Sequence, residues 1–230
     1  MKSAALHEIK EFRNRVEVFR DREDAGNTLA DMLEPDYAGR EDVTILAIPA
    51  GGVPVGLKVR ERLGASFDLV IARKLKIPDN KEAGFGAMTH GGRVFLNEAL
   101  VRDLRLEEKD IEAETEAVEV ELEKRNQLFR EGRPFPVLRG RVVVLVDDGL
   151  ASGFTMLSSI HMVKEREAAE TVVAVPTAPK RTLDRVLPEV DAVYCPNVRE
   201  STFFAVADAY VRWYDLTEDE VVELLTRTTG

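Results

Sequence analysis

Cysteine, histidine and long apolar runs are scarce in this chain of 230 residues, and their scarcity excludes several kinds of protein. Cys195 is the single cysteine, so neither a disulfide framework nor a thiolate metal cluster can form within the chain, and we expect a buried side chain rather than a nucleophile. The three histidines, His7, His90 and His161, are far apart and form no two-histidine metal motif. No apolar stretch approaches the roughly 20 residues of a membrane span.

Positive charge is in deficit, and the formal net charge is −10. This balance argues against nucleic acid or an anionic membrane as a partner. Small anions can still bind, because backbone N–H groups form local anion sites regardless of net charge. The N-terminal region is charged and lacks the apolar segment of a signal peptide, so we expect a cytoplasmic protein.

One stretch combines three features that favour a ligand site. Val142–Val146 is an unbroken β-branched and aliphatic run, typical of a strand buried on both faces of a parallel sheet. Two acids, Asp147 and Asp148, end this run. A small, glycine-containing segment then leads into a helix with apolar spacing; it consists of Gly149, Leu150, Ala151, Ser152, Gly153, Phe154 and Thr155.

This order of elements has chemical consequences. A tight loop before a helix leaves backbone N–H groups without carbonyl partners, and together with the helix dipole they can bind a phosphate. Ser152 and Thr155 can add hydroxyl donors. Carboxylates beside a bound anion need other partners, which sugar hydroxyls and Mg²⁺ would provide. The stretch therefore predicts a site for a phosphorylated sugar, with Asp147 and Asp148 as candidate Mg²⁺ ligands.

Two other phosphate loops do not fit this stretch. It has no Gly-Lys-Ser/Thr, which excludes a nucleotide triphosphatase loop, and no G-x-G-x-x-G, which excludes a dinucleotide fingerprint. The alternative is an ordinary strand–helix turn in which Asp147 or Ser152 caps the helix. We favour a binding site, because few such turns combine a buried run, an acid pair and a small-Gly-x-Thr loop.

Residues 143–155 resemble the signature with which type I phosphoribosyltransferases bind phosphoribosyl pyrophosphate (PRPP): four apolar residues, two acids, two mostly apolar residues, then small-small-Gly-x-Thr. Gly149 stands where that signature usually has an aliphatic residue. The resemblance implies that Asp147 and Asp148 are the acids of the catalytic site and hold the ribose hydroxyls. It also implies that residues 151–155 bind the 5-phosphate, with Mg²⁺ as cofactor.

A second strand, glycine turn and helix unit comes earlier in the chain. Residues 43–48 have a strand pattern and 53–63 a helix pattern, joined by Pro49, Ala50, Gly51 and Gly52. The turn can bind an anion by the same argument, although a Gly-Gly turn is commonplace on its own. In the family the corresponding loop binds pyrophosphate, and similar members have Pro-Arg-Gly-Gly here. Ala50 therefore removes one positive partner.

Arg73 and Lys74 follow the next predicted strand, residues 67–72. The ends of parallel strands form the edge where α/β sheets bind ligands. The resemblance implies that both cations face pyrophosphate. The alternative is a solvated pair at a surface turn, and we favour the ligand-binding role because of the position.

Two further segments are expected to border the site. Residues 76–96 are rich in Pro, Gly and charge and predict a mobile flap containing a β-hairpin of 87–89 and 93–96; in the family such a loop closes over the active site, but no role can be assigned to Lys81 or Glu82. Residues 195–214 are rich in aromatics and follow the last strand, where the family places a hood over the nucleobase. Phe203 and Phe204 are the candidate base-binding residues; alternatively, the rings seal the sheet edge.

The strand patterns predict the fold class. Five strands separated mostly by helices imply an α/β protein with a doubly wound, mainly parallel five-stranded sheet, in a single domain over 1–230; the strands are residues 43–48, 67–72, 142–146, 171–175 and 191–194. Residues 4–33 predict helix and 34–39 a loop. The apolar stripe on a long helix over 107–130 could be a dimer seam, but its inward packing is favoured. From the family we expect a homodimer.

The resemblance implies transfer of 5-phosphoribosyl from PRPP to a nitrogen nucleophile such as a nucleobase, with release of pyrophosphate, as in nucleotide salvage. Ala151 stands where enzymes for 6-oxopurines carry an Asp, so the acceptor stays open. The alternative is a non-catalytic PRPP-binding regulator on the same fold, which Ala50 favours and the charge of −10 disfavours. A sugar-phosphate hydrolase would need a nucleophile or metal cluster that the sequence lacks.

Overall fold

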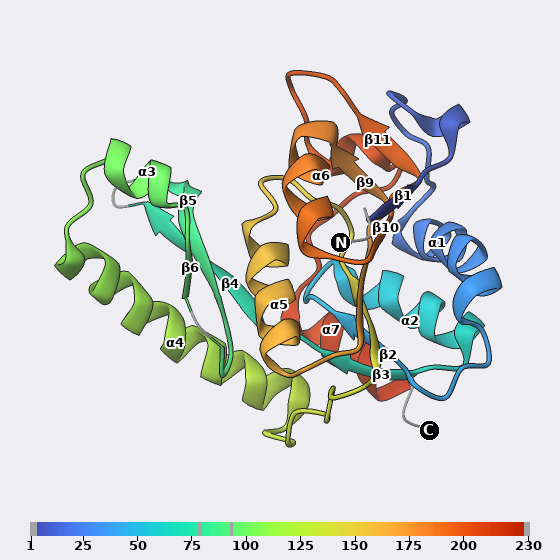
Figure 1. The fold of residues 1–230 in the computed structure, drawn as a ribbon, viewed down its shortest axis with the longest axis horizontal. Helices are drawn as coiled ribbons and strands as arrows, with labels where there is room; N and C mark the ends of the chain where they lie inside the picture. The colour runs from blue at the N-terminus through green and yellow to red at the C-terminus, as the bar shows by residue number, and fades with distance from the viewer. Residues whose placement is uncertain (1–3, 78–79, 93, 228–230) are drawn as a thin grey trace.

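A six-stranded parallel sheet organises the chain (Figure 1). The structure is a computed structural model that describes residues 4–77, 80–92 and 94–227, without the side chains of 80–83. Strand order in the sheet is β1-β10-β8-β7-β2-β3. The strands are β1 (Ala5–His7), β2 (Val43–Ala47), β3 (Ser66–Leu69), β7 (Val142–Val146), β8 (Glu170–Ala174) and β10 (Ala192–Tyr194). The predicted parallel α/β class is confirmed, with β7 at the centre.

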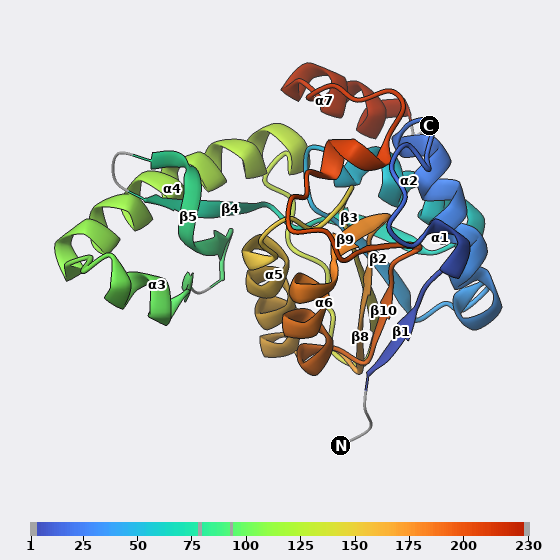
Figure 2. The same cartoon turned by 90° about the horizontal axis from the view of Figure 1, so that it is seen from above.

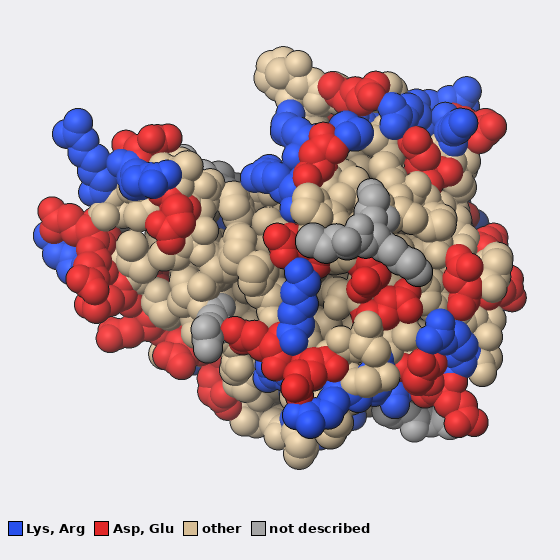
Figure 3. Space-filling view, viewed as in Figure 1, with Lys and Arg blue, Asp and Glu red and all other residues tan. Residues whose placement is uncertain are grey.

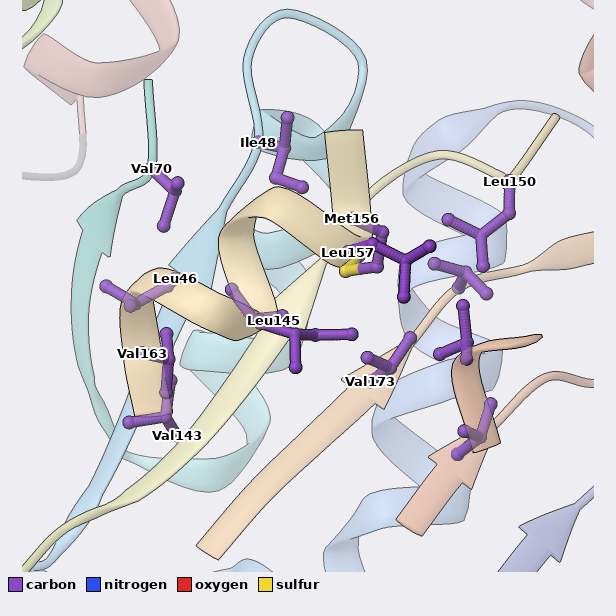
Figure 4. Close-up of a cluster of buried hydrophobic side chains, with 14 of the residues drawn as sticks. Leu46, Ile48, Val70, Val143, Leu145, Leu150, Met156, Leu157, Val163 and Val173 are labelled. Carbon is purple, nitrogen blue, oxygen red and sulfur yellow. The ribbon is translucent and has the colours of Figure 1, made fainter. Parts of the chain in front are cut away.

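Helices cover both faces of the sheet (Figure 2). On one face lie α1 (Arg22–Tyr37) and α2 (Gly52–Leu63), and on the other α5 (Phe154–Glu165) and α6 (Lys180–Val186). Strand β7 is buried along its whole length because its alternate side chains enter two different cores. Val144 packs with α1 and α2. Val143 and Leu145 pack under α5, and Figure 4 shows these two side chains. The apolar run that predicted this strand is thus explained by burial on both faces.

A separate lobe projects from the sheet (Figure 1). It holds an antiparallel sheet of β4 (Ala72–Ile77), β5 (Asn80–Thr89) and β6 (Val94–Leu96), followed by α3 (Glu98–Asp103) and α4 (Glu108–Arg130). The apolar stripe of α4 faces inward, where Val118, Leu122 and Phe129 pack against the lobe and α7. Acidic side chains gather along the opposite side of α4 (Figure 3).

Short elements close the end of the sheet at which β7 terminates. Strands β9 (Thr177–Pro179) and β11 (Asn197–Arg199) form a parallel pair, and α7 (Glu218–Arg227) packs on α2 and α4 through Val221. The 3₁₀ helices are η1 (Lys10–Phe12), η2 (Leu187–Glu189) and η3 (Val206–Ala209). Cys195 is fully buried in the core beside these strands, and burial raises the pKa of its thiol. Within the described ranges, none of the helices is long and apolar enough to cross a membrane.

The predicted helix over 4–33 is wrong for its first half. Residues 5–7 are strand β1, which pairs with β10 and adds a sixth strand to the predicted five. Asn14 and Glu17 have positive φ values of 61° and 52°, which a helix does not accommodate. Helix α1 begins only at Arg22, because the Asp21 carboxylate caps it by accepting from the Asp24 N–H at 3.0 Å.

Two other boundaries differ from the predictions. Helix α1 continues through Pro35 to Tyr37, where a loop was predicted; Tyr37 is buried and its hydroxyl donates to Glu170 at 2.7 Å, which holds the last turn. The predicted strand over 67–72 ends at Leu69, since the chain leaves the main sheet for the lobe at β4. Strands β5 and β6 pair in antiparallel fashion, while Arg93, the predicted start of the second hairpin strand, lies outside the described residues.

Candidate active site

The segment after β7 forms a loop that ends at the start of α5, and Ala151 and Ser152 are its exposed residues. Gly153 has a φ of +82° and is the N-cap residue of α5, without a side-chain cap bond. The helix is therefore not capped by Asp147 or Ser152, as the alternative of an ordinary turn would require. The first-turn N–H groups of α5 have no capping side chain. Together with the positive end of the helix dipole, they can bind an anion at the start of α5.

A cavity of about 440 Å³ lies over this loop. Its volume falls in the range typical of small-molecule sites. The loop supplies most of the wall, together with Lys74, Gly84 and Gly86 from the projecting lobe and Val206 from η3. From the loop and helix come Asp147, Gly149, Leu150, Ala151, Ser152, Gly153, Phe154, Thr155 and Met156. The predicted phosphate-binding residues therefore share one cavity with a single predicted pyrophosphate cation.

Asp147 is the acid that lines the cavity. Its Oδ1 atom accepts a hydrogen bond from the Asp148 N–H at 2.8 Å. Burial raises the pKa of Asp147 well above its ordinary value, and the neighbouring charge of Asp148 raises it further. A bound cation or hydroxyl donors would favour the ionised form of this carboxylate.

Asp148 points elsewhere and pairs with a residue that the sequence did not single out. Its Oδ2 atom lies 2.8 Å from Nε of Arg22, and the two side chains are only 14% and 8% exposed. Burial raises the pKa of Asp148, and the charge of Arg22 opposes that rise. The Asp148 backbone carbonyl accepts from the Tyr210 hydroxyl at 2.6 Å. Asp148 is therefore fixed from two sides and does not line the cavity.

The second predicted loop adjoins the first because β2 and β7 are neighbours in register, with Ala47 opposite Val146. Helix α2 begins at Gly52, next to Ala50 and Gly51, and the Pro49–Ala50 peptide bond is cis. A Cβ atom on Gly51 would lie 1.8 Å from Oδ2 of Asp148. Only glycine permits this approach, so the two loops meet at the Asp148 carboxylate.

Arg73 and Lys74 point to opposite sides of β4, as successive strand residues do. Lys74 lines the cavity. Arg73 instead faces α4, where its Nε atom lies 3.5 Å from the Glu121 carboxylate. The structure thus places one cation of the predicted pair at the cavity and the other in the lobe.

The two predicted base-binding rings do not line the cavity. Phe203 is 90% exposed, and Phe204 lies beside Arg199, whose guanidinium carbon is 5.9 Å from the ring centroid. Other aromatics of this segment pack inward: Tyr210 lies 5.7 Å from Phe19 and 5.2 Å from Trp213. Val206 is the residue of the predicted hood that reaches the cavity wall.

Sequence reasoning missed Arg22 and Val206. Both come from segments distant in sequence from the motif, and only the fold brings them to it. One signal for Arg22 was available: it is the first residue of α1, where the helix dipole disfavours a cation. A cation at that position indicates a compensating partner elsewhere in the molecule.

Comparison with known proteins agrees with this geometry. The family model described as "Phosphoribosyl transferase domain" matches residues 17–211. The chain is 36% identical over 212 residues to "Putative phosphoribosyl transferase Rv0571c" of Mycobacterium tuberculosis; the match covers 92% of this chain but 47% of that protein, so the chain spans about half of its length.

Solved structures show the same relationship. The crystal structure of the TT1426 protein from Thermus thermophilus is 34% identical, with a TM-score of 0.75 over 91% of this chain and 98% of that one. The AQ2163 protein of Aquifex aeolicus, at 14% identity and a TM-score of 0.51 over 82% of this chain and 78% of that one, shares the fold. On the family match and the identity to the Thermus thermophilus protein, the chain belongs to the phosphoribosyl transferase domain family.

Proposed function

We propose that this protein transfers the 5-phosphoribosyl group of PRPP to a nitrogen nucleophile, such as a nucleobase, and releases pyrophosphate. The observation that carries the proposal is the cavity in which Asp147, the loop before α5 and Lys74 meet. A phosphate, a sugar and a second phosphate group each find a chemically suitable partner along this wall.

The residues have distinct roles in this proposal. Residues 151–155 supply the N–H groups that bind the 5-phosphate, together with the hydroxyls of Ser152 and Thr155. Gly149 and Leu150 complete this phosphate loop as cavity wall, since the Leu150 N–H already donates to the Thr177 carbonyl at 2.9 Å. Asp147 and Asp148 accept hydrogen bonds from the ribose hydroxyls. Residues 50–52 and Lys74 bind pyrophosphate, while Arg73, which faces Glu121, contributes only a more distant charge.

In the reaction, the bond from the anomeric carbon to pyrophosphate breaks and its electron pair leaves with the pyrophosphate. The nitrogen of the acceptor forms the new bond to the anomeric carbon, and its proton passes to water. The transition state resembles an oxocarbenium ion, so the carboxylate of Asp147 at the cavity wall can stabilise the developing positive charge. Closure of the lobe carrying β4 and β5 would exclude water, and β5 already contributes Gly84 and Gly86 to the cavity.

The donor set fits Mg²⁺ bound together with substrate. No group of three or more His, Cys, Asp or Glu side chains in the described ranges is arranged to hold a metal by itself. Mg²⁺ is commonly held by one or two carboxylates plus substrate phosphates. Asp147 fits this role because its carboxylate lines the cavity beside the phosphate loop, and Asp148 is its neighbour. When bound, the ion would neutralise the leaving pyrophosphate.

One observation favours the non-catalytic alternative, a protein that binds PRPP as a regulator. Ala50 provides no charge at the predicted pyrophosphate loop, and α2 has no basic residue in its first turn. The net charge of −10 speaks against a nucleic-acid target for such a regulator. A homodimer, a cytoplasmic location and a part in nucleotide salvage belong to the same proposal as the transferase activity.

Pyrophosphate release separates the two functions. With PRPP and Mg²⁺, we expect pyrophosphate to appear in the presence of at least one compound from a panel of purine and pyrimidine bases and other nitrogen nucleophiles. Calorimetric titration with PRPP and Mg²⁺ is the companion measurement. Binding without release for any acceptor would favour the regulator, and an absence of PRPP binding would contradict both functions.

A further inference from the structure

Arg22 is the only cation shown in contact with the acid pair among the described residues. Its Nε atom donates to Oδ2 of Asp148 and its Nη1 atom donates to the carbonyl of Tyr214, both at 2.8 Å. The guanidinium carbon lies 4.0 Å from the centroid of the Trp213 ring. Three different contacts therefore fix the plane of this guanidinium, which is 8% exposed.

The chain builds this contact from two distant segments. Backbone hydrogen bonds tie residues next to Arg22 to the segment after η3: the Val211 N–H donates to the Phe19 carbonyl at 2.8 Å, and the Arg212 N–H to the Arg20 carbonyl at 2.9 Å. The same segment supplies Tyr210, whose hydroxyl holds the Asp148 carbonyl. Ordinary surface ion pairs lack such backbone hydrogen bonds between their segments and contribute little to stability. The Arg22–Asp148 pair therefore differs from an incidental surface contact.

The Asp148 carboxylate lies where the two loops meet. A Cβ atom on Gly51 would be 1.8 Å from its Oδ2 atom and 2.9 Å from its Oδ1 atom, so both oxygens contact the predicted pyrophosphate loop. Arg22 binds Oδ2, and the Asp148 side chain is 14% exposed, so part of this carboxylate is accessible at the junction. In the proposed binding mode the 5-phosphate lies on the phosphate loop and pyrophosphate on residues 50–52, so the ribose between them would pass this junction.

We propose that Arg22 is a positioning residue of the ribose site: it fixes the Asp148 carboxylate at the junction of the two loops, so that Asp148 can accept from a ribose hydroxyl. This inference rests on the proposed function, since it assumes that the junction binds a phosphorylated ribose. Arg22 acts through Asp148 and does not itself contact a phosphate. Arg22 on α1 thus fixes the Asp148 carboxylate, whereas the pyrophosphate loop, with Ala50, has no charged side chain that could do so.

The test compares two ligands that differ only in the sugar. Ribose 5-phosphate and inorganic phosphate are titrated, by calorimetry or phosphorus NMR, into the wild-type protein, Arg22→Gln and Arg22→Lys. We expect Arg22→Gln to weaken ribose 5-phosphate binding about tenfold, because the Asp148 carboxylate loses the charged hydrogen bond that orients it. Its affinity for phosphate should stay within about twofold of wild type, and Arg22→Lys should weaken ribose 5-phosphate binding by only about threefold, since it keeps the charge.

Two controls show whether Arg22 works through Asp148. Arg20→Gln removes an exposed cation two residues away, paired with Asp21, and should change neither affinity. The double variant Arg22→Gln with Asp148→Asn should bind ribose 5-phosphate as weakly as Asp148→Asn alone, because the two residues act as one unit. Additive losses would overturn the proposal.

Other outcomes also decide. Equal losses for phosphate and ribose 5-phosphate would show a direct phosphate contact or a general structural role, and tighter binding in Arg22→Gln would show that Arg22 keeps Asp148 away from ligands; either overturns the inference. If Arg22→Gln does not fold, the ratio of the two affinities in Arg22→Lys decides, and an unchanged ratio overturns it. A wild-type protein that binds no ribose 5-phosphate would refute the proposed function, whereas normal wild-type binding with a wild-type-like Arg22→Gln refutes this inference alone.

Discussion

Asp147→Asn is expected to stabilise the ligand-free protein while weakening PRPP binding about a hundredfold. The loss of affinity follows because the carboxylate at the cavity wall is the group proposed to accept ribose hydroxyls and share Mg²⁺, and hydrogen bonds to charged groups are among the strong ones. The gain in stability follows because the ionised Asp147 is half-buried and lies beside the charge of Asp148. We expect removal of this charge to raise the free energy of unfolding by about 1 kcal/mol, which corresponds to a rise of about 2–4 °C in Tm for a chain of this size.

The gain in stability should depend on pH in a defined direction. The folded-state pKa of Asp147 is raised above the ordinary value of 3.8, so the folded protein holds this proton more tightly than the unfolded chain does. Stability of the wild-type protein therefore falls as pH rises from about that ordinary value through the folded-state pKa, and it levels off above. The Tm difference between variant and wild type should be small near pH 4 and should grow with rising pH.

Asp42→Asn is the matched control for this experiment. The Arg40 guanidinium beside Asp42 holds the pKa of that exposed carboxyl below its ordinary value, which is the opposite direction from Asp147. Its amide variant should give no rise in Tm at neutral pH and should bind PRPP as the wild type does. The account is contradicted if Asp147→Asn loses stability at neutral pH or retains its affinity for PRPP.

Gly153→Ala is expected to weaken phosphate binding at least tenfold, whereas Gly140→Ala should leave it unchanged. Both glycines have positive φ values, +82° and +74°, so alanine strains the backbone in each and lowers stability by about 1 kcal/mol. The surroundings differ. A Cβ atom on Gly153 would lie 2.6 Å from Cγ2 of Thr182, but one on Gly140 would meet nothing within 4 Å.

Comparison of Gly153→Ala with Gly140→Ala separates the effect of backbone strain from the effect on phosphate binding. Displacement of Gly153 shifts the start of α5 and with it the N–H groups proposed to bind the 5-phosphate. The measurements are Tm by calorimetry and affinity for inorganic phosphate and PRPP by titration. We expect both variants to lose stability, Gly153→Ala more because of its clash with Thr182, and only Gly153→Ala to lose affinity. Equal affinities of the two variants for phosphate would show that the loop before α5 does not bind the phosphate.

The central part of the fold could be predicted from the sequence because its signals are local. The apolar run of β7 reflects burial on both faces, and the glycines after it reflect the turn before α5. The N-terminal region could not be predicted in this way. Residues 5–7 have no strong strand pattern of their own, and they are extended because β10 offers a free edge.

In the candidate site, too, the residues with local sequence signals could be predicted, and those positioned by distant segments could not. The loop before α5 and Lys74 could be found from the sequence, since they follow strands whose ends lie at the ligand edge. The orientation of Asp148 could not, because it is set by Arg22 and Gly51 from two other segments. The same reason applies to Phe203 and Phe204: composition suggested stacking, but their distance from the cavity depends on how the chain returns from β11 through η3.

The most direct test of the account is a crystal structure with ribose 5-phosphate bound. The account predicts the phosphate at the start of α5, within hydrogen-bond distance of the N–H groups of residues 151–155, and the ribose hydroxyls facing Asp147 and Asp148. A structure in which this loop is empty and the ligand is bound elsewhere on the protein would contradict it.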